Sequence, residues 1–207
     1  MAFTYFFRDR LTLNVIQSHA IPELKRRRYI HIWDAGCAMG PEPYSLALML
    51  RENLGEKHFK YITIHATDID ESSQFEEIIK QGIYRRDQIK SVPQDILDNY
   101  FQSLDGSGYV QVKKEIRDSI AYQKHDLLSL QPVRTNVSLV MCKNVLLHFH
   151  PGERSKVLTM FHGALEKNGF LVMEQTQYLP EEVSGLFEPV VSHARLYRKV
   201  AADVPGV

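Results

Sequence analysis

The sequence predicts an α/β fold built on a mostly parallel β-sheet, and three observations carry that prediction. An apolar, strand-like run over residues 29–33 leads into a turn of small residues, 34–40, and an apolar helical pattern follows from Tyr44 to Leu50. Strand-like and helix-like segments then alternate along much of the chain, as expected for right-handed strand–helix–strand crossovers. Residues 137–142 form an apolar run that is typical of a strand buried on both faces.

Length and charge limit the classes of function. The chain has 207 residues, which suits one domain with a full core. It carries 25 basic and 25 acidic residues, so net charge supports neither a nucleic acid nor a membrane surface as a partner. The basic run at residues 25–28 is interpreted as a solvated helix end. We expect a monomer.

Cysteine usage and hydropathy indicate the cellular setting. The two cysteines, Cys37 and Cys142, are far apart in sequence, and no carboxylate-rich motif accompanies the histidines. We therefore expect neither a disulfide nor a metal site, and a reducing, cytoplasmic environment. No apolar stretch approaches the ~20 residues of a membrane span, and no signal peptide is recognisable.

The alternation of strands and helices covers both ends of the chain. The first elements expected are a helix over 5–24 ended or kinked at Pro22, a strand over 29–34, a helix over 42–54 capped by Gly55, a strand over 61–67, and a helix over 71–80 capped by Asp70 and ended by Gly82. The last are a strand over 137–142, a helix from Pro151 to about residue 166, a strand over 169–174, and two strands within 187–199.

Between these parts the alternation is interrupted. Residues 83–125 contain a short helix near 94–101, a glycine turn at 106–108, and strand-like segments at 109–112 and 119–124. We interpret residues 83–125 as a small inserted β-meander, not as another strand–helix–strand unit. Residues 1–200 then form a single domain that carries this insertion, and 201–207 are a C-terminal tail.

Small or polar residues follow four of the expected strands. Gly36, Ala38 and Gly40 lie in the first turn, Asp68 and Asp126 follow two further strands, and the fourth strand is followed by residues 142–144. Because the carboxyl ends of parallel strands face one crevice, these residues are expected to share a ligand site. A glycine turn alone is weak evidence, since it is also a plain tight connection.

Three acidic residues define the kind of ligand. Asp68 is placed to accept hydrogen bonds from ribose hydroxyls, with helix capping as the alternative, and Asp126 is placed to accept from an adenine amine, with a local Asx turn as the alternative. Glu42 could face an amino group or simply complement the helix dipole. The turn lacks a Walker lysine and the third glycine of dinucleotide sites, so an adenosyl ligand without a pyrophosphate fits best.

Several motifs resemble one family in order and spacing. They are TYFFRD from Thr4, WDAGCAMGPEPYSLA from Trp33, ATDID from Ala66, GIY from Gly82, and CKNVLLHF from Cys142. With these motifs the chain resembles the CheR-type chemotaxis receptor methyltransferases, which use S-adenosylmethionine to esterify glutamates of chemoreceptors. The resemblance implies a Rossmann-like class I methyltransferase fold: a mostly parallel seven-stranded sheet with helices on both faces, and a small antiparallel β-subdomain that docks the receptor. It covers nearly the whole chain without the family's usual N-terminal helical domain.

The resemblance also implies roles for individual residues. Glu42 would meet the methionine amino group and Asp68 the ribose, while Asp126 and Leu127 would border the adenine. Asn144, Val145 and the turn with Gly36, Ala38 and Gly40 would line the methionine and sulfonium region. Thr4 and Arg8 would close the pocket, with Arg8 near the methyl group or the incoming carboxylate. The product would be S-adenosylhomocysteine, and the partner a chemoreceptor-like or other signalling protein.

The departures from the family lie mostly on the acceptor side. His148 stands where a tyrosine is usual near the methyl group, Lys143 replaces an arginine, and Pro41 replaces a common acid. Two alternatives therefore stay open. One is a methyltransferase for another substrate, with His148 as a catalytic general base. The other is a non-catalytic adenosylmethionine-binding scaffold or sensor.

Overall fold

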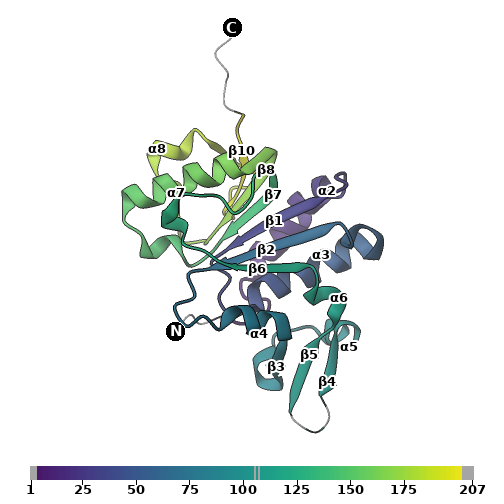
Figure 1. Cartoon of the computed structure of the whole chain (residues 1–207). Coiled ribbons are helices and arrows are strands. Elements are labelled where there is room, and N and C mark those ends of the chain that lie inside the picture. Colours follow the sequence, from purple (N-terminus) through teal and green to yellow (C-terminus); the bar gives the residue numbers. More distant parts are fainter. Residues whose placement is uncertain (1–3, 105, 107, 202–207) are drawn as a thin grey trace.

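The core of the molecule is one seven-stranded sheet. The computed structural model describes residues 4–104, 106 and 108–201, and residues 202–207 of the predicted tail at 201–207 lie outside them. The strand order is β6-β2-β1-β7-β8-β10-β9, and the first five of these run parallel (Figure 1). Their bounds are β1 Ile30–Ala35, β2 Ile62–Asp68, β6 Ile120–Lys124, β7 Val137–Cys142, β8 Leu165–Met173, β9 Phe187–Pro189 and β10 Leu196–Lys199. The predicted seven-stranded, mostly parallel sheet is confirmed.

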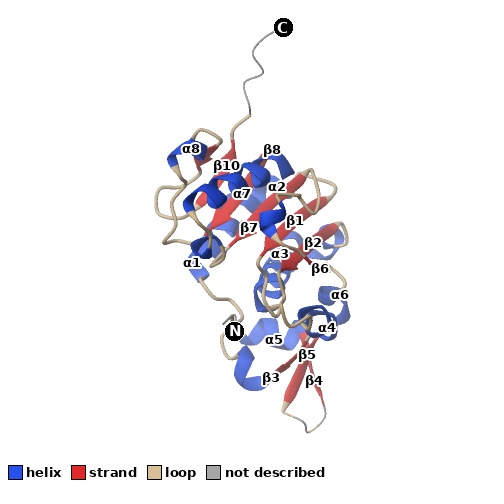
Figure 2. Cartoon of the chain, turned by 60° about the vertical axis from the view of Figure 1, so that its left-hand side comes forward, coloured by secondary structure: helices blue, strands red, loops and turns tan. Residues whose placement is uncertain are grey.

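Helices cover both faces of this sheet. One face carries α1 (Arg10–Val15), the π-helical turn η1 (Ile16–Ala20), α2 (Ile21–Leu24) and α3 (Pro41–Phe59). The other carries α7 (Pro151–Ala164) and α8 (Glu181–Ser184) (Figure 2). Two apolar clusters fill the spaces on either side, one containing Ile32 and Leu46 and the other Trp33 and Phe161. The alternating residues of β1 thus divide between two cores, as the pleat of a strand requires.

The direction of strand addition reverses at β1. The chain first builds outward from β1 to β2 and β6, and it then returns to place β7 on the other side of β1. Neighbouring connections leave to opposite faces at such a point and open a crevice at the carboxyl ends of the strands. The fold therefore directs the ends of β1, β2 and β7 toward one site.

A second, antiparallel sheet is built from β3 (Ile83–Arg85), β5 (Tyr109–Val112) and β4 (Phe101–Leu104), in that order. It lies at one end of the molecule together with α4 (Phe75–Gln81), η2 (Arg86–Ile89), α5 (Gln94–Tyr100) and α6 (Lys114–Arg117) (Figure 1). The expected β-insertion is thus present. One part of it was misplaced, because Ile120–Lys124 pairs with β2 in the main sheet and not with the insertion.

Several helix ends differ from the expected ones. The first helix begins at Arg10 and not at residue 5, a π-helical turn interrupts it over Ile16–Ala20, and it ends at Leu24 as expected. The expected end at Gly55 is instead a kink, with φ 73° and ψ 166°, inside a helix that runs to Phe59. Asp70 does accept from the amide of Phe75 at 2.9 Å, but the helix begins there and not at residue 71. α7 ends at Ala164, and β8 starts at the next residue.

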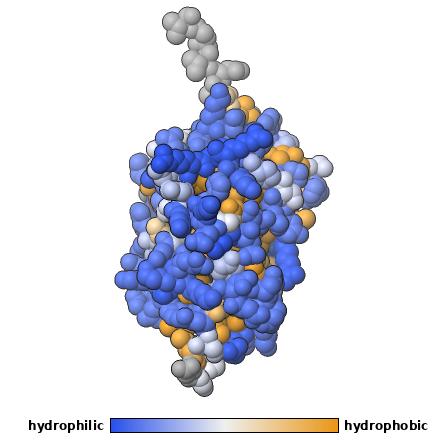
Figure 3. Space-filling model, turned by 90° about the vertical axis from the view of Figure 1, so that its right-hand side faces the viewer, coloured by the Kyte–Doolittle hydropathy of each residue, from blue (hydrophilic) through white to orange (hydrophobic). Residues whose placement is uncertain are grey.

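The surface shows no broad apolar face in the view of Figure 3, where hydrophobic side chains are scattered among polar ones. Among the described residues, no helix combines the length and apolar character that a membrane crossing needs. No group of three or more metal-ligating side chains is found within the same described part of the chain.

Candidate adenosyl-binding site

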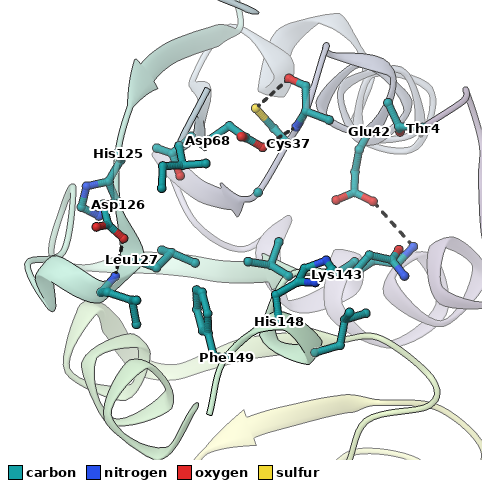
Figure 4. A pocket seen from close by; sticks show the side chains of 18 of the residues that line it. Thr4, Cys37, Glu42, Asp68, His125, Asp126, Leu127, Lys143, His148 and Phe149 are labelled. Atoms are coloured by element: carbon teal, nitrogen blue, oxygen red, sulfur yellow. Dashed lines mark hydrogen bonds and ion pairs between the residues drawn. The ribbon is translucent and has the colours of Figure 1, made fainter. Parts of the chain in front are cut away.

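A cavity of about 590 Å³ opens at the carboxyl ends of β1, β2 and β7 (Figure 4). This volume lies within the ~300–1,000 Å³ range of small-molecule sites. All of the predicted site residues except Gly40 line it: Thr4, Arg8, Gly36, Ala38, Glu42, Asp68, Asp126, Leu127, Asn144, Val145 and His148. Segments far apart in sequence therefore converge on one cavity, as expected from the strand ends.

The two glycines of the first turn serve different purposes. Gly36 has φ 102°, and a Cβ atom placed there would lie 2.0 Å from Cγ2 of Val145, another cavity residue. Gly40 has φ 103° and caps α3, and its missing side chain leaves room for Tyr84, whose hydroxyl would lie 2.6 Å from an added Cβ. Gly36 therefore shapes the cavity wall, whereas Gly40 joins the turn to the insertion and is not part of the wall.

Asp68 ends β2 with its carboxylate held by backbone amides. Oδ2 accepts from the amide of Ala38 at 2.9 Å, and Oδ1 accepts from that of Asp70 at 3.1 Å. These bonds fix the carboxylate between two strand ends and leave further lone pairs for a ligand. Asp70, not Asp68, accepts from the amides of Gln74 and Phe75 at the start of the helix that follows.

Asp126 adopts the local turn that was its alternative role. Its Oδ1 accepts from the amide of Leu128 at 2.8 Å, which is an Asx-type turn, and the residue is exposed at the rim. The turn occupies one carboxylate oxygen only. Leu127 next to it is buried and packs in the core cluster under α7, so it offers the cavity a fixed apolar surface.

The N-terminal segment closes the cavity from one side. The amide of Phe7 donates to Ser45 Oγ at 2.8 Å, and the buried ring of Phe6 packs against Tyr44 and Tyr84. Thr4 and Arg8 reach the cavity from this anchored segment. Asp9 then caps α1 by accepting from the amide and the hydroxyl of Thr12, at 3.2 and 2.6 Å.

Lys143 belongs to the strand-end segment 142–144 that was expected at the ligand site, and it is also a departure from the family. Its side chain is 3% exposed, and Nζ lies 3.2 Å from Asp9 Oδ2 and 3.7 Å from Glu42 Oε2. Figure 4 shows Glu42 and Lys143 approaching each other across the cavity floor. A buried ammonium requires such partners, because desolvation without compensation is costly. Lys143 therefore ties the N-terminal segment to the start of α3.

Glu42 has a second acidic neighbour, Asp34, behind the cavity wall. Asp34 is fully buried and does not line the cavity, unlike Gly36, Cys37 and Ala38 of the same turn. Burial, with the nearby charge of Glu42, raises the pKa of Asp34 well above its ordinary value. Burial also raises the pKa of Glu42, while Lys143 and Arg8 act in the opposite direction. Both carboxyl groups thus have a raised pKa, and the charge of Lys143 opposes that rise at each of them.

The remaining wall comes from the segment after β7. Asn144 lies there in the left-handed region with φ 59°, and His148 is exposed at the mouth. Cys37 and Lys143 come from strand-end segments expected at the site, and the cavity residues outside the predicted set are Thr67, Ile69, His125, Leu128, Leu147 and Phe149. Most of them directly neighbour a predicted residue in the chain, so position next to a strand end was the available signal.

The hydrogen-bond acceptors of the cavity suit an adenosyl ligand that carries an amino group. The carboxylates of Glu42, Asp68 and Asp126 all meet this cavity. Such acceptors match ammonium and hydroxyl groups and oppose phosphate, which agrees with the absence of a phosphate-binding turn. Apolar side chains of Leu127, Val145 and other residues provide surface for a flat ring.

Comparison with known proteins agrees with this geometry. The family described as CheR methyltransferase, SAM binding domain, matches residues 2–195. A chemotaxis protein methyltransferase of Borreliella burgdorferi is 29% identical over 182 residues, which cover 84% of this chain and 63% of that protein. Chemotaxis protein methyltransferase 2 of Vibrio cholerae is 28% identical over 201 residues, which cover 95% and 67%. The chain thus spans about two thirds of the length of these relatives.

A solved structure supports the fold. Magnesium protoporphyrin IX methyltransferase of Synechocystis, determined with S-adenosylmethionine bound, has a TM-score of 0.50 at 14% identity, covering 93% of this chain and 79% of that one. The predicted Rossmann-like class I methyltransferase fold is confirmed, and the family confirms S-adenosylmethionine as the cofactor. The chain belongs to the CheR methyltransferase family, of which it contains the S-adenosylmethionine-binding domain.

Proposed function

We propose that this domain transfers the methyl group of S-adenosylmethionine to a carboxylate side chain of a chemoreceptor-like protein. The observation that carries the proposal is the convergence of Glu42, Asp68 and Arg8 on one cavity. The relatives named chemotaxis protein methyltransferases support a protein acceptor.

Each end of the cofactor has a candidate partner. Glu42 would receive the α-amino group, and Asp68, held by two backbone amides, would accept from the ribose hydroxyls. Asp126 and Leu127 would border the adenine, and Gly36, Ala38, Asn144 and Val145 would enclose the methionine part. The cofactor supplies a methyl group on a cationic sulfur atom.

The acceptor side needs alignment more than proton transfer. A glutamate carboxylate has a reference pKa of ~4.3 and is ionised at neutral pH, so no general base is required. Arg8, carried by the anchored N-terminal segment, would hold the carboxylate through its fork of donors. Closure by this segment would also exclude water, which matters because opposite charges are neutralised as the methyl group moves.

A second cavity supports an approach of the acceptor to the methyl group from the side of the insertion. It has a volume of about 790 Å³ and shares Thr4 with the first. Its other lining residues include Arg85, Asp87 and Lys90 from the insertion. Arg85 is paired with Asp87 at 3.1 Å, so Lys90 leaves this cavity with an excess of positive charge. An acidic polypeptide segment entering here would reach the methyl end beside Thr4 and Arg8.

Calorimetry with S-adenosylhomocysteine, followed by labelled-methyl transfer to receptor peptides, tests the proposal. We expect wild-type binding, and a loss of roughly 10- to 100-fold in affinity for Glu42→Gln, the effect of removing a charged hydrogen-bond partner worth ~1.5–3 kcal/mol. Asp118→Asn, on the exposed pair with Lys114, is the matched control. No binding by the wild type would refute the cofactor site, and binding without transfer to glutamate peptides would refute the acceptor.

His148 provides the discriminating variant on the acceptor side. It lines the cavity mouth where the family usually has a tyrosine. If His148→Tyr increases transfer to receptor peptides, the receptor assignment gains support. If His148→Gln abolishes transfer to a hydroxyl or amine acceptor that the wild type methylates, His148 is a general base and the acceptor is of another class.

A further inference from the structure

Asp34 is a buried acid that the proposed chemistry leaves without a role. It lies on β1 beneath the turn of small residues and is 0% exposed. Neither of its carboxylate oxygens meets a hydrogen-bond donor from the described residues. The carboxyl group of Glu42 lies close enough to raise the pKa of Asp34. An ionised carboxylate in such a place would be both desolvated and unpaired, which is among the most costly arrangements in a protein.

The charges around Asp34 determine which carboxyl group holds the proton. Lys143 approaches Glu42 to 3.7 Å and is held on its other side by Asp9. Asp68 adds a further negative charge near Asp34, and the thiols of Cys37 and Cys142 lie close enough that Asp34 raises their pKa. Arg8 and Glu174 act on Glu42 with opposite signs. Glu42 therefore has the only ammonium contact of the two acids within the described residues, and Asp34 has none.

We propose that Asp34 is a positioning residue of the cofactor site, which remains protonated and donates its O–H to Glu42. The hydrogen bond would fix the rotamer of Glu42 from behind, while Lys143 holds it from the side. With Asp34 neutral, Asp9 and Glu42 outweigh Lys143 by one negative charge. That excess matches the single positive charge of an α-amino group. The inference rests on the proposed role of Glu42 and adds the residue that orients it.

Substitutions that separate charge from hydrogen bonding test this inference. Asp34→Asn keeps a donor and carries no charge, so we expect its affinity for S-adenosylhomocysteine to stay within about twofold of wild type. Asp34→Leu keeps the approximate size and removes the donor, and we expect a loss of about tenfold. Had Asp34 been ionised, Asp34→Asn would remove a negative charge beside the ammonium and weaken binding at least as much as Asp34→Leu. That result would overturn the proposal.

A second measurement decides the protonation state without any ligand. In infrared spectra of protein with carbonyl-labelled aspartate, the wild type should show the band of a protonated carboxylic acid at neutral pH. Asp34→Asn should lack it, and Asp118→Asn should retain it. Absence of the band from the wild type would refute the proposal. If the wild type fails to bind S-adenosylhomocysteine yet shows the band, the proposed cofactor site is wrong while Asp34 still holds its proton.

Discussion

At the scale of single residues, the burial of Asp34 leads to a prediction about how stability depends on pH. Its pKa is raised in the folded protein, so folding takes up a proton at pH values between the ordinary carboxyl value of 3.8 and the raised pKa. The native state then binds more protons than the unfolded state, and the free energy of unfolding falls as pH rises from that value toward the raised pKa. Below pH 3.8 Asp34 is protonated in both the folded and the unfolded state, and this loss of stability vanishes.

Asp34→Asn removes that cost, since an amide does not titrate. We expect the melting temperature of Asp34→Asn to exceed that of the wild type at pH 7, with the difference shrinking as the pH falls toward 4. Thermal unfolding followed by circular dichroism over this range provides the measurement. A variant that melts lower than the wild type at pH 7 would show that Asp34 is ionised and well paired.

Some residues of the site could be identified from the sequence alone, and others could not. Glu42, Asp68 and Arg8 were identifiable because each follows a strand or belongs to a motif with fixed spacing. Lys143 was visible as part of a strand end and as a replacement for arginine, but its ion pairs were not, since Asp9 and Glu42 are more than 100 positions away in the chain. Asp34 was expected in the crevice with its turn, and only the three-dimensional structure shows that it lies behind the wall.

At the scale of elements, the turn between β1 and α3 joins the cavity to the insertion. Gly40 → Ala would place a methyl group 2.6 Å from the Tyr84 hydroxyl at a position with φ 103°. We expect a loss of about 2 kcal/mol or more in the free energy of unfolding, from overpacking and backbone strain together. Urea denaturation measures this loss.

Gly108→Ala is the matched control for that substitution. Gly108 also has positive φ, at 75°, but an added Cβ would meet nothing within 4 Å. The loss in the free energy of unfolding of Gly108→Ala reports backbone strain alone, and we expect it to be about 1 kcal/mol. Equal losses for the two variants would mean that the contact with Tyr84 adds nothing, contrary to the packing seen here.

The accuracy of the predicted elements depended on the kind of contact that forms each one. Apolar runs such as residues 137–142 were assigned correctly, because burial on both faces leaves a local pattern. The segment Ile120–Lys124 was assigned to the wrong sheet, since its sequence is half polar and its pairing with β2 is a long-range choice. Helix bounds were missed at the first helix, which begins at Arg10, and at Gly55, after which the helix continues to Phe59.

At the scale of the whole molecule, ligand binding should stabilise the fold as a unit. The cavity is lined by residues at or after the ends of β1, β2, β6 and β7, at the start of α3 and in the N-terminal segment, so a ligand would contact segments that are distant in the sequence. S-adenosylhomocysteine at about 100 times its dissociation constant should add roughly 2.7 kcal/mol to the free energy of unfolding. A melting scan over ligand concentration measures it, and an unchanged melting temperature at saturation would contradict a site formed only in the folded state.

The position of Lys143 has a consequence for how two substrates would influence each other. Lys143 contacts Glu42, the proposed cofactor partner, and also Asp9, the residue next to Arg8. A ligand that alters one contact alters the other, so cofactor and acceptor should bind with a coupling free energy. Thermodynamic linkage then requires reciprocity: the factor by which S-adenosylhomocysteine changes peptide affinity equals the factor by which peptide changes S-adenosylhomocysteine affinity. We expect Lys143→Met to bring that factor toward one, while Lys156→Met on the exposed side of α7 leaves it unchanged.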